Sequence, residues 1–437
     1  MKRTSSIPSV LLETGSKAPS TEELRLTGNG GLAGRLVRGR LKLLEHGCLE
    51  LVHGKRVDVF GKPGDPLTAK AVVRDDRFWD AMLLRGSVGA GEAYFKGWWT
   101  TDDPVAVVRI FVRNLEALER LEGGMALISR PFLWAYHALR SNTRKGSRSN
   151  ISAHYDLSNE FFALFLDDSM TYSAGIYEHA EATLDEAQAA KLDRICKKLG
   201  LTPEDHLLEI GTGWGSMAIH AAKHYGCRVT TTTISREQHS HAAERIRQEG
   251  LEDRIELLLC DYRDLEGTYT KAVSVEMIEA VGANFYGTYF ETVDRLLAPD
   301  GIFLMQAITI ADQHFERARK AVDFIQRYIF PGCCIPSVQA LLGAATERSS
   351  LRMIDLEDIT THYARTLAEW RERLNDHYAS ARALGLSHED LRLWEFYFAY
   401  CEGGFAEGHL GDVHLIFNKP GSRPGTRPVF APAPIHS

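Results

Sequence analysis

The sequence lacks any run approaching the roughly 20 consecutive apolar residues that a helix needs to cross a bilayer. Its first segment, MKRTSSIPSVLLETGSKAPS, has no apolar stretch long enough for the core of a signal peptide. These absences predict a cytoplasmic protein. Any contact with the inner face of the cytoplasmic membrane would then be peripheral.

Paired cysteines and metal-binding motifs are also missing. The chain has seven cysteines, an odd number, and none forms a CxxC pair. A disulfide framework is therefore not indicated, and a reducing compartment fits best. His154 has no second and third ligand at usable spacing, so we expect no metal site.

Positive charge is not in excess either. The 51 lysines and arginines are outnumbered by 58 acidic residues, which gives a net charge of -7 and argues against nucleic-acid binding. With 44% hydrophobic and 25% charged residues the composition is that of an ordinary globular protein. A length of 437 residues exceeds one typical core and predicts two domains.

Composition divides the chain into five segments. Residues 1–28 are rich in Ser, Pro, Thr and Gly and are predicted to be disordered. A smaller α+β domain is expected over 29–140. The polar, basic segment 141–150 is either a solvated linker or a loop that meets anionic lipid headgroups. The main domain is expected over 151–420, followed by a flexible tail over 421–437.

The smaller domain begins with a predicted helix over 32–44, LAGRLVRGRLKLL. Its apolar residues share one broad side, and Arg35, Arg38 and Lys42 lie on the other. This pattern fits a helix in a lipid interface or a surface helix packed on its own domain. The second is favoured, because Gly34 and Gly39 weaken an isolated helix. A hairpin over 49–60, a strand over 67–73 and a short helix over 78–86 are expected next.

The segment GEAYFKGWW (91–99) concentrates aromatic side chains. They suit either an acyl tunnel or the core of a small domain.

From about Leu184 the chain alternates amphipathic helices with short apolar strands. Such alternation predicts a doubly wound, mostly parallel sheet of the α/β class. The predicted strands are 206–211, 227–234, 254–260, 271–278 and 301–309, and the predicted helices are 184–200, 215–225 and 236–249.

A glycine-rich turn follows the first of these strands in LLEIGTGWGS (207–216). Gly211, Gly213 and Gly215 permit a tight turn and a close approach of the backbone to a ligand. The spacing is GxGxG, not the dinucleotide GxGxxG. The second strand ends in TTTIS (231–235) without an acid, which argues against NAD.

The third strand ends in CDYRDL (260–265). Asp261 could accept a hydrogen bond from an adenine amine, with Tyr262 packed against the ring. Asp261 could instead cap the following helix. Together with the glycine turn, the cofactor role is favoured.

Several segments resemble the cyclopropane fatty-acid synthases and the mycolic acid cyclopropane synthases. They are SAHYDLSNEFFALFLDDSMTYSAG (152–175), LEIGTGWGS (208–216), TTISREQ (232–238), DYRDL (261–265), VSVEMIEAVG (273–282), YIFPGCCIPSV (328–338) and HYARTLAEWRERL (362–374). The resemblance covers roughly residues 150–410. GEAYFKGWW resembles the smaller domain of the bacterial phospholipid enzymes, which makes that branch the closer match.

The resemblance implies a Rossmann-like methyltransferase domain that uses S-adenosylmethionine, preceded by a lipid-binding N-terminal domain. The implied cofactor contacts are Tyr172, Ser173, Gly211, Gly213, Thr233, Ile234, Gln238, Tyr262 and Arg263. The glycine turn itself adds Gly215, and the end of the third strand adds Asp261. It also implies a bicarbonate ion near the reacting carbon. The expected bicarbonate site consists of Ala174, Glu279, Gln306, Ile308 and Tyr363.

Three positions depart from the family pattern. Ala174 stands where the family often has Cys, Ala280 where it has His, and Gln306 where it often has His. A backbone N–H at Ala174 and the amide of Gln306 could still donate hydrogen bonds. We therefore expect an anion site of altered detail. Glu276 falls inside the predicted strand 271–278 and is assigned no role.

These residues predict methyl transfer to the cis double bond of an unsaturated phospholipid acyl chain. The transfer leaves a carbocation, and a base must remove a proton from the added methyl before a cyclopropane ring can close. Bicarbonate held by Glu279 and Tyr363 could serve as that base. The alternatives are a methyl-branched or methylene fatty-acid product, a small-molecule N-methyltransferase, and a lipid-binding protein without activity. The sequence leaves open whether the protein forms a homodimer.

Overall fold

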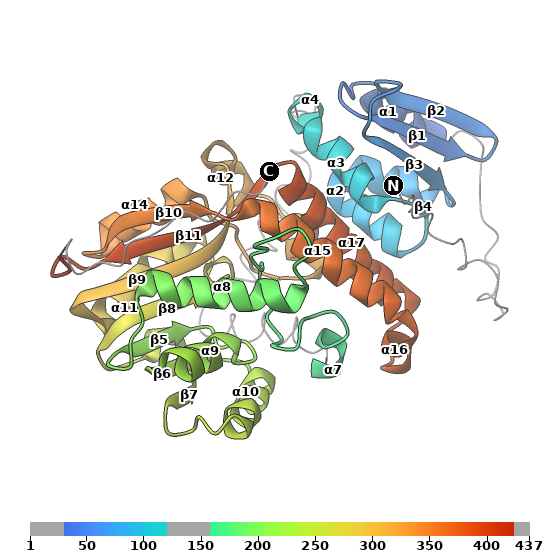
Figure 1. The fold of residues 1–437 in the computed structure, drawn as a ribbon. Helices are drawn as coiled ribbons and strands as arrows, with labels where there is room; N and C mark the ends of the chain where they lie inside the picture. Colours follow the sequence, from blue (N-terminus) through green and yellow to red (C-terminus); the bar gives the residue numbers. More distant parts are fainter. Residues whose placement is uncertain (1–29, 120–157, 424–437) are drawn as a thin grey trace.

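The computed structural model describes residues 30–119 and 158–423, which form an N-terminal unit and a larger α/β unit (Figure 1). The predicted linker 141–150 and nearly all of the predicted terminal segments lie outside the described residues. The domain boundaries therefore stay predictions. Within the described residues no helix is both long and apolar enough to span a bilayer.

The N-terminal unit is a four-stranded sheet covered by helices, with strand order β2-β1-β3-β4. The predicted hairpin is present, because β1 and β2 pair antiparallel with His53 opposite Arg56. β3 runs parallel to β1 and antiparallel to β4. The elements are α1 (Gly31–Leu41), β1 (Cys48–His53), β2 (Arg56–Gly61), β3 (Thr68–Val73), α2 (Arg77–Phe95), β4 (Trp99–Thr101), α3 (Pro104–Arg113) and α4 (Leu115–Glu119).

The predicted division of the first helix into one apolar and one basic side is wrong for α1. Val37 is buried against the unit, whereas Leu36 is 45% exposed. Arg38, expected on the outer side, is buried, where it forms an ion pair with Asp58 at 2.9 Å and lies over the ring of Trp79. A partner for its charge makes the burial of this arginine tolerable.

The predicted end of the second helix at Gly86 is a kink instead. Gly86 adopts φ 52° and ψ -127°, and α2 then continues to Phe95. The second half passes close to the larger unit, since a Cβ at Gly91 would come within 2.4 Å of the Phe324 ring. Glycine makes both the kink and this close approach feasible.

The aromatic segment 91–99 lies at the contact between the two units. The Tyr94 ring packs on Phe396, and its hydroxyl donates to Glu395 at 2.9 Å. Arg392 donates to the Tyr94 carbonyl from the other direction. The core interpretation of this segment therefore holds for Tyr94, while Trp99 is buried and also lines the main cavity.

The larger unit is built on a seven-stranded sheet of order β10-β11-β9-β8-β5-β6-β7. The strands from β9 to β7 in this order are parallel. β11 pairs antiparallel with both β9 and the edge strand β10. This confirms the predicted doubly wound α/β fold. The strands are β5 (His206–Ile210), β6 (Arg228–Thr233), β7 (Ile255–Leu259), β8 (Tyr269–Val275), β9 (Leu297–Ile310), β10 (Arg352–Asp358) and β11 (Leu410–Asn418).

Helices cover both faces of this sheet and form separate cores. The helices α8 (Leu184–Leu199), α9 (Ser216–Tyr225) and α10 (Arg236–Gln248) pack on one face. The helices α11 (Tyr286–Leu296) and α14 (Val338–Arg348) pack on the other. The shorter α12 (Asp312–Ala318) lies beside α14.

A third core joins the two units through α15 (Thr360–Asp376) and α17 (His388–Ala406), which lie between the large sheet and the N-terminal unit in Figure 1. The short α7 (Asn159–Phe162), α13 (Phe324–Tyr328) and α16 (Tyr378–Ala383) pack around them. Trp370 and Phe398 are fully buried there. Because its residues come from both units, this core fixes one unit against the other.

Candidate active site

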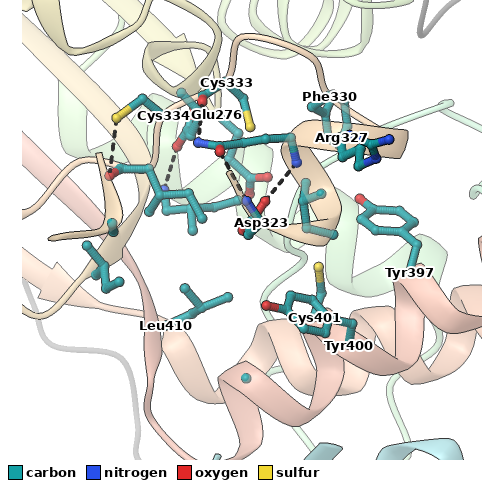
Figure 2. Close-up of a pocket in the computed structure, with 18 of the residues that line it drawn as sticks. Glu276, Asp323, Arg327, Phe330, Cys333, Cys334, Tyr397, Tyr400, Cys401 and Leu410 are labelled. Atoms are coloured by element: carbon teal, nitrogen blue, oxygen red, sulfur yellow. Dashed lines mark hydrogen bonds between the residues drawn. The ribbon is translucent and has the colours of Figure 1, made fainter. Parts of the chain in front are cut away.

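A single large cavity lies at the carboxyl ends of the parallel strands and continues between the two units. Its volume is about 1550 Å³. The residues that follow β5, β6, β7 and β8 line one end, and residues of α1, α2 and α3 line the other. Open α/β sheets bind their ligands at this edge. In Figure 2, Tyr397, Tyr400 and Cys401 of α17 lie across the pocket from Cys333 and Cys334.

The glycine turn forms the floor at the β5 end of the cavity. Gly211, Gly213 and Gly215 have φ of 105°, 53° and 92°, which glycine alone adopts without strain. The backbone N–H of Gly211 donates to the Thr232 carbonyl at 3.1 Å, which ties the turn to β6. Gly211 and Gly213 line the cavity.

Gly215 has a different position from the one predicted. It does not line the cavity but forms the N-cap of α9. Its φ of 92° favours glycine, whereas a Cβ there would make only ordinary contacts with Ala242 and Ile219 at 3.4 Å. Its requirement is structural.

The ends of β6 and β7 supply polar side chains to the same end of the cavity. Thr233 Oγ1 donates to Gln238 Oε1 at 2.8 Å, and Ile234 lines the cavity beside them. Asp261 both caps the turn η2 (Tyr262–Asp264) and pairs with the guanidinium of Arg263 at 2.6 Å. Asp261 also lines the cavity, so its capping and binding interpretations are compatible.

The aromatic and hydroxyl residues expected at the cofactor also line the cavity. The Tyr172 hydroxyl donates to that of Tyr397 at 3.1 Å. Lys191 Nζ donates to Ser173 Oγ at 2.8 Å. Tyr172 and Ser173 both line the cavity, and so does Tyr262, whose pKa burial raises to about 12.

Two buried charged residues of this region were missed from the sequence. Lys191 is fully buried, and burial lowers its pKa to about 8. Glu209 accepts from Thr231 Oγ1 at 2.6 Å, and burial raises its pKa to about 8. A signal for Lys191 was present, because it lies at helical spacing between the buried residues Ala187 and Ile195.

Glu276 is the most heavily hydrogen-bonded side chain at the β8 end of the cavity. Its Oε1 accepts from the Ala174 backbone N–H and from Gln306 Nε2, both at 2.8 Å. Its Oε2 accepts from the Tyr363 hydroxyl at 2.6 Å. Burial raises the pKa of Glu276, and the hydrogen bonds from these three residues oppose that rise.

These contacts correct the predicted bicarbonate site. Ala174 and Gln306 have no exposed surface and do not line the cavity, because they lie behind Glu276. Tyr363 lines the cavity, but its hydroxyl is bound to the same carboxylate. The carboxylate of Glu276 therefore holds the donors that bicarbonate was expected to use.

Glu279 and Ile308, the remaining members of the predicted anion site, lie together on the cavity wall. The Ile308 N–H donates to Glu279 Oε1 at 2.6 Å, while Glu279 Oε2 is buried without a hydrogen-bond partner. Burial and the neighbouring charge of Glu276 raise the pKa of Glu279 to about 8.

Glu276 was missed because the strand was predicted to run through it. β8 ends at Val275, and Glu276 adopts φ 45°. This left-handed conformation takes its side chain out of the strand's alternation and toward Ala174 and Tyr363. An acid directly after a parallel strand, beside Glu279, was the available signal.

A second layer of buried polar groups lies behind Gln306. The Gln306 amide donates to Asp412 Oδ2 at 2.9 Å as well as to Glu276. Its Oε1 lies 3.3 Å from His414 Nε2, which fixes the orientation of the amide. In the part of the chain that the structure describes, no group of three or more His, Cys, Asp or Glu side chains is arranged to hold a metal ion.

Comparisons with known proteins agree with this site. Residues 142–415 match the family model for mycolic acid cyclopropane synthetase. The chain is 38% identical over 349 residues to tuberculostearic acid methyltransferase UfaA1 of Mycobacterium tuberculosis, covering 77% of this chain and 80% of that protein. It is 35% identical over 350 residues to cyclopropane-fatty-acyl-phospholipid synthase of Escherichia coli, covering 79% and 87%.

Solved structures that resemble this chain include members of the same family. The cyclopropane synthase MmaA2 from Mycobacterium tuberculosis is 30% identical with a TM-score of 0.58, covering 62% of this chain and 98% of that one. The mycolic acid cyclopropane synthase CmaA1, solved with SAH and CTAB, is 30% identical with a TM-score of 0.57 and the same coverage. Coclaurine N-methyltransferase, at 21% identity and a TM-score of 0.58, shares the fold alone.

The family model covers more than half of the chain, and both the curated relatives and the cyclopropane synthase structures above belong to the same group. This chain therefore belongs to the mycolic acid cyclopropane synthetase family and is an S-adenosylmethionine-dependent methyltransferase.

Proposed function

We propose that this enzyme transfers the methyl group of S-adenosylmethionine to the cis double bond of an unsaturated phospholipid acyl chain and then closes a cyclopropane ring. The observation that carries the proposal is one continuous cavity. It joins the glycine turn and the buried carboxylates to an apolar passage that reaches the N-terminal unit.

The residues at the β5–β7 end fit the methyl donor. Gly211 and Gly213 let the backbone approach it closely, and the polar side chains of Gln238 and Asp261 suit a ribose and an adenine. When bound, S-adenosylmethionine supplies a methyl group on a positively charged sulfur. Tyr172 and Trp214, which line the cavity, help to exclude water from that sulfur.

The rest of the cavity fits a long apolar chain. Val107 and Phe111 of α3 line it at the N-terminal unit, and Phe330 and Leu410 line it near the carboxylates. An alkene is a weak nucleophile, so the enzyme must align it and keep water out. Aromatic faces and the carboxylates at the β8 end would stabilise the carbocation left by methyl transfer.

Bicarbonate does not fit the site that the family resemblance implied. The Ala174, Gln306 and Tyr363 donors are bound to Glu276, and the Ile308 N–H is bound to Glu279. No step of the proposed reaction is therefore assigned to that ion.

The outer face of α1 supports a peripheral contact with the membrane. Leu32 and Leu36 are exposed there beside Arg35, and Lys42 and Leu43 are exposed directly after the helix ends. Apolar and basic side chains without acids suit an anionic lipid interface. The inner side of the same helix reaches the cavity through Val37 and Leu41, which suggests a route for an acyl chain from the bilayer to the site.

A second candidate product is a methyl-branched or methylene acyl chain. The 38% identical relative UfaA1 is named a tuberculostearic acid methyltransferase, which favours this outcome. Both products begin with the same methyl transfer to an alkene. An amine acceptor has weaker support, since the likeness to coclaurine N-methyltransferase carries the fold alone.

The test supplies methyl-labelled S-adenosylmethionine and vesicles of dioleoyl-phosphatidylglycerol, with saturated dimyristoyl vesicles as the control. We expect label in the dioleoyl lipid only, and NMR of the product should give the shielded ring protons of a cyclopropane. A methyl-branched or methylene product would select the second candidate. Label in small amines with none in lipid would contradict the proposal.

The membrane contact is tested with two matched substitutions. Leu36 and Leu384 are 45% and 44% exposed, but Leu384 follows α16 and lies far from α1 in the chain. Leu36→Asp should weaken sedimentation with anionic vesicles about tenfold, the order expected for losing one inserted leucine and adding a like charge. Leu384→Asp should leave it unchanged. Equal effects would refute the role of α1.

A further inference from the structure

We infer that the carboxylate of Glu276 is itself the base that removes the proton after methyl transfer, so that this enzyme needs no bicarbonate. The inference deepens the proposed function and rests on it. The Glu276 carboxylate accepts the hydrogen bonds from the donors that the family resemblance assigned to bicarbonate.

The partners of Glu276 favour its ionised form. The Ala174 N–H and the Gln306 amide nitrogen can only donate hydrogen bonds, and both meet the same oxygen, Oε1. The Tyr363 hydroxyl meets the other oxygen at 2.6 Å, a length typical of a charge-assisted bond. Hydrogen bonds donated to a carboxylate stabilise its charged state, which is the state that accepts a proton.

The backbone at Glu276 is held in a strained conformation. Its φ of 45° is left-handed, and the only other described non-glycine residue with positive φ is Met170. Such a conformation is unfavourable for a residue with a side chain. The sheet fixes this turn, because the Glu276 N–H donates to the Gln306 carbonyl at 2.9 Å. The strain brings a carboxylate to a position where a glycine would fit more easily.

Charged groups around Glu276 come from its own loop and from two other elements. Glu279 lies on the same loop, Asp412 lies on β11 and is bridged to Glu276 through Gln306, and Lys191 reaches in from α8. The positive charge of Lys191 offsets part of this negative charge. Glu276 both lines the cavity and accepts hydrogen bonds from three residues.

The chemistry balances without a further reactant. The alkene's π electrons form a bond to the methyl carbon, and the carbon–sulfur bond breaks with its electron pair left on sulfur. The other alkene carbon becomes a cation. Glu276 then accepts a proton from the new methyl group, and the electrons of that C–H bond close the ring onto the cation. The proton leaves Glu276 for solvent after the product departs.

The experiment compares wild type with Glu276→Gly and Glu276→Gln in buffer freed of carbon dioxide, with dioleoyl-phosphatidylglycerol vesicles. Wild type should keep full turnover. Both variants should lose on the order of 10²- to 10⁴-fold, the usual contribution of a positioned base. Thermal unfolding and S-adenosylhomocysteine binding serve as controls, and Glu276→Gly should unfold no earlier than wild type because glycine relieves the strain.

Added bicarbonate or formate should raise the turnover of Glu276→Gly at least tenfold, because removal of the side chain leaves space and free donors for a small anion. Chloride at equal ionic strength should not, and Glu276→Gln should stay inactive because its amide fills the space. Loss of wild-type turnover without bicarbonate, full turnover of Glu276→Gln, or no rescue of a folded Glu276→Gly would each overturn the inference. A wild type inactive on every lipid would instead refute the proposed function.

Discussion

The two ends of the cavity are built in different ways. The end at β5–β7 is made of backbone and of side chains that follow consecutive strands, such as Gly211, Gln238 and Asp261. The end at β8–β9 is made of side chains from distant segments, which converge on Glu276. Under the proposed function, the first arrangement would bind the methyl donor, and the second would determine what happens to the acceptor.

This difference separates two measurable quantities. Substitutions at the β5–β7 end should change the affinity for the methyl donor. Substitutions at the β8–β9 end should change turnover and its pH dependence and leave donor affinity nearly intact. Each prediction below would sharpen that separation or break it.

Among substitutions around Glu276 and at the donor end, other than those of Glu276 itself, the largest effect is expected for Tyr363→Phe. It removes the hydroxyl that donates to Glu276 Oε2 and leaves the packing of the ring on Phe405 in place. Loss of a hydrogen bond to a charged group, about 1.5–3 kcal/mol, should lower turnover about 10- to 100-fold. Calorimetry should give an unchanged affinity for S-adenosylhomocysteine. A comparable loss of affinity would break the separation of the two ends.

Next is Gly213→Ala, paired with Gly250→Ala. Both glycines have positive φ, 53° and 66°, and a Cβ at either has no neighbour within 4 Å. Both variants should therefore lose a similar amount of stability, about 1 kcal/mol. Gly213 lines the cavity, so its variant alone should bind S-adenosylhomocysteine about tenfold more weakly. Equal affinities for the two variants would rule out a role of the turn in donor binding.

Gln306→Leu should shift the pH dependence of turnover. Gln306 donates to Glu276, and the loss of one donor raises the pKa of the carboxyl group that must be ionised. The acid limb of kcat/KM should move to higher pH by about one unit, which corresponds to about 1.4 kcal/mol. An unmoved acid limb with lower turnover would indicate a structural role only.

The smallest effect is expected for Glu209→Gln at the donor end. Burial raises the pKa of Glu209 to about 8, whereas an unfolded chain has a value of about 4.3. Between these values the folded protein retains a proton that the unfolded chain releases, so the free energy of unfolding falls as pH rises from about 5 to about 8. In the ligand-free variant, urea unfolding should show a shallower fall. Identical slopes would mean that Glu209 is ionised in the fold.

The sequence was informative where function follows local order. The strand alternation, the turn at Gly211 and Gly213 and the position of Asp261 just after β7 are each contained in a few neighbouring residues. The N-terminal helix was harder to predict, because the ion pair of Arg38 with Asp58 joins residues 20 positions apart. Local pattern could not indicate that this arginine would be buried.

The acceptor end could not be assembled from the sequence for the same reason. Ala174 and Glu276 are 102 positions apart, and Tyr363 and Glu276 are 87. The family pattern supplied the donors correctly as residues but assigned them to bicarbonate. The left-handed backbone of Glu276, which sends its carboxylate to those donors, has no signature in a run such as VSVEMIEAVG.

The measurement closest to the central claim follows the hydrogens of the transferred methyl group. S-adenosylmethionine carrying a trideuterated methyl is supplied with dioleoyl-phosphatidylglycerol vesicles, and the acyl product is weighed by mass spectrometry. Methyl transfer to an alkene, followed by removal of a proton from that same methyl, predicts a product that retains two of the three deuterons. A product that retains all three would contradict the account, because no base would then have acted on the transferred group.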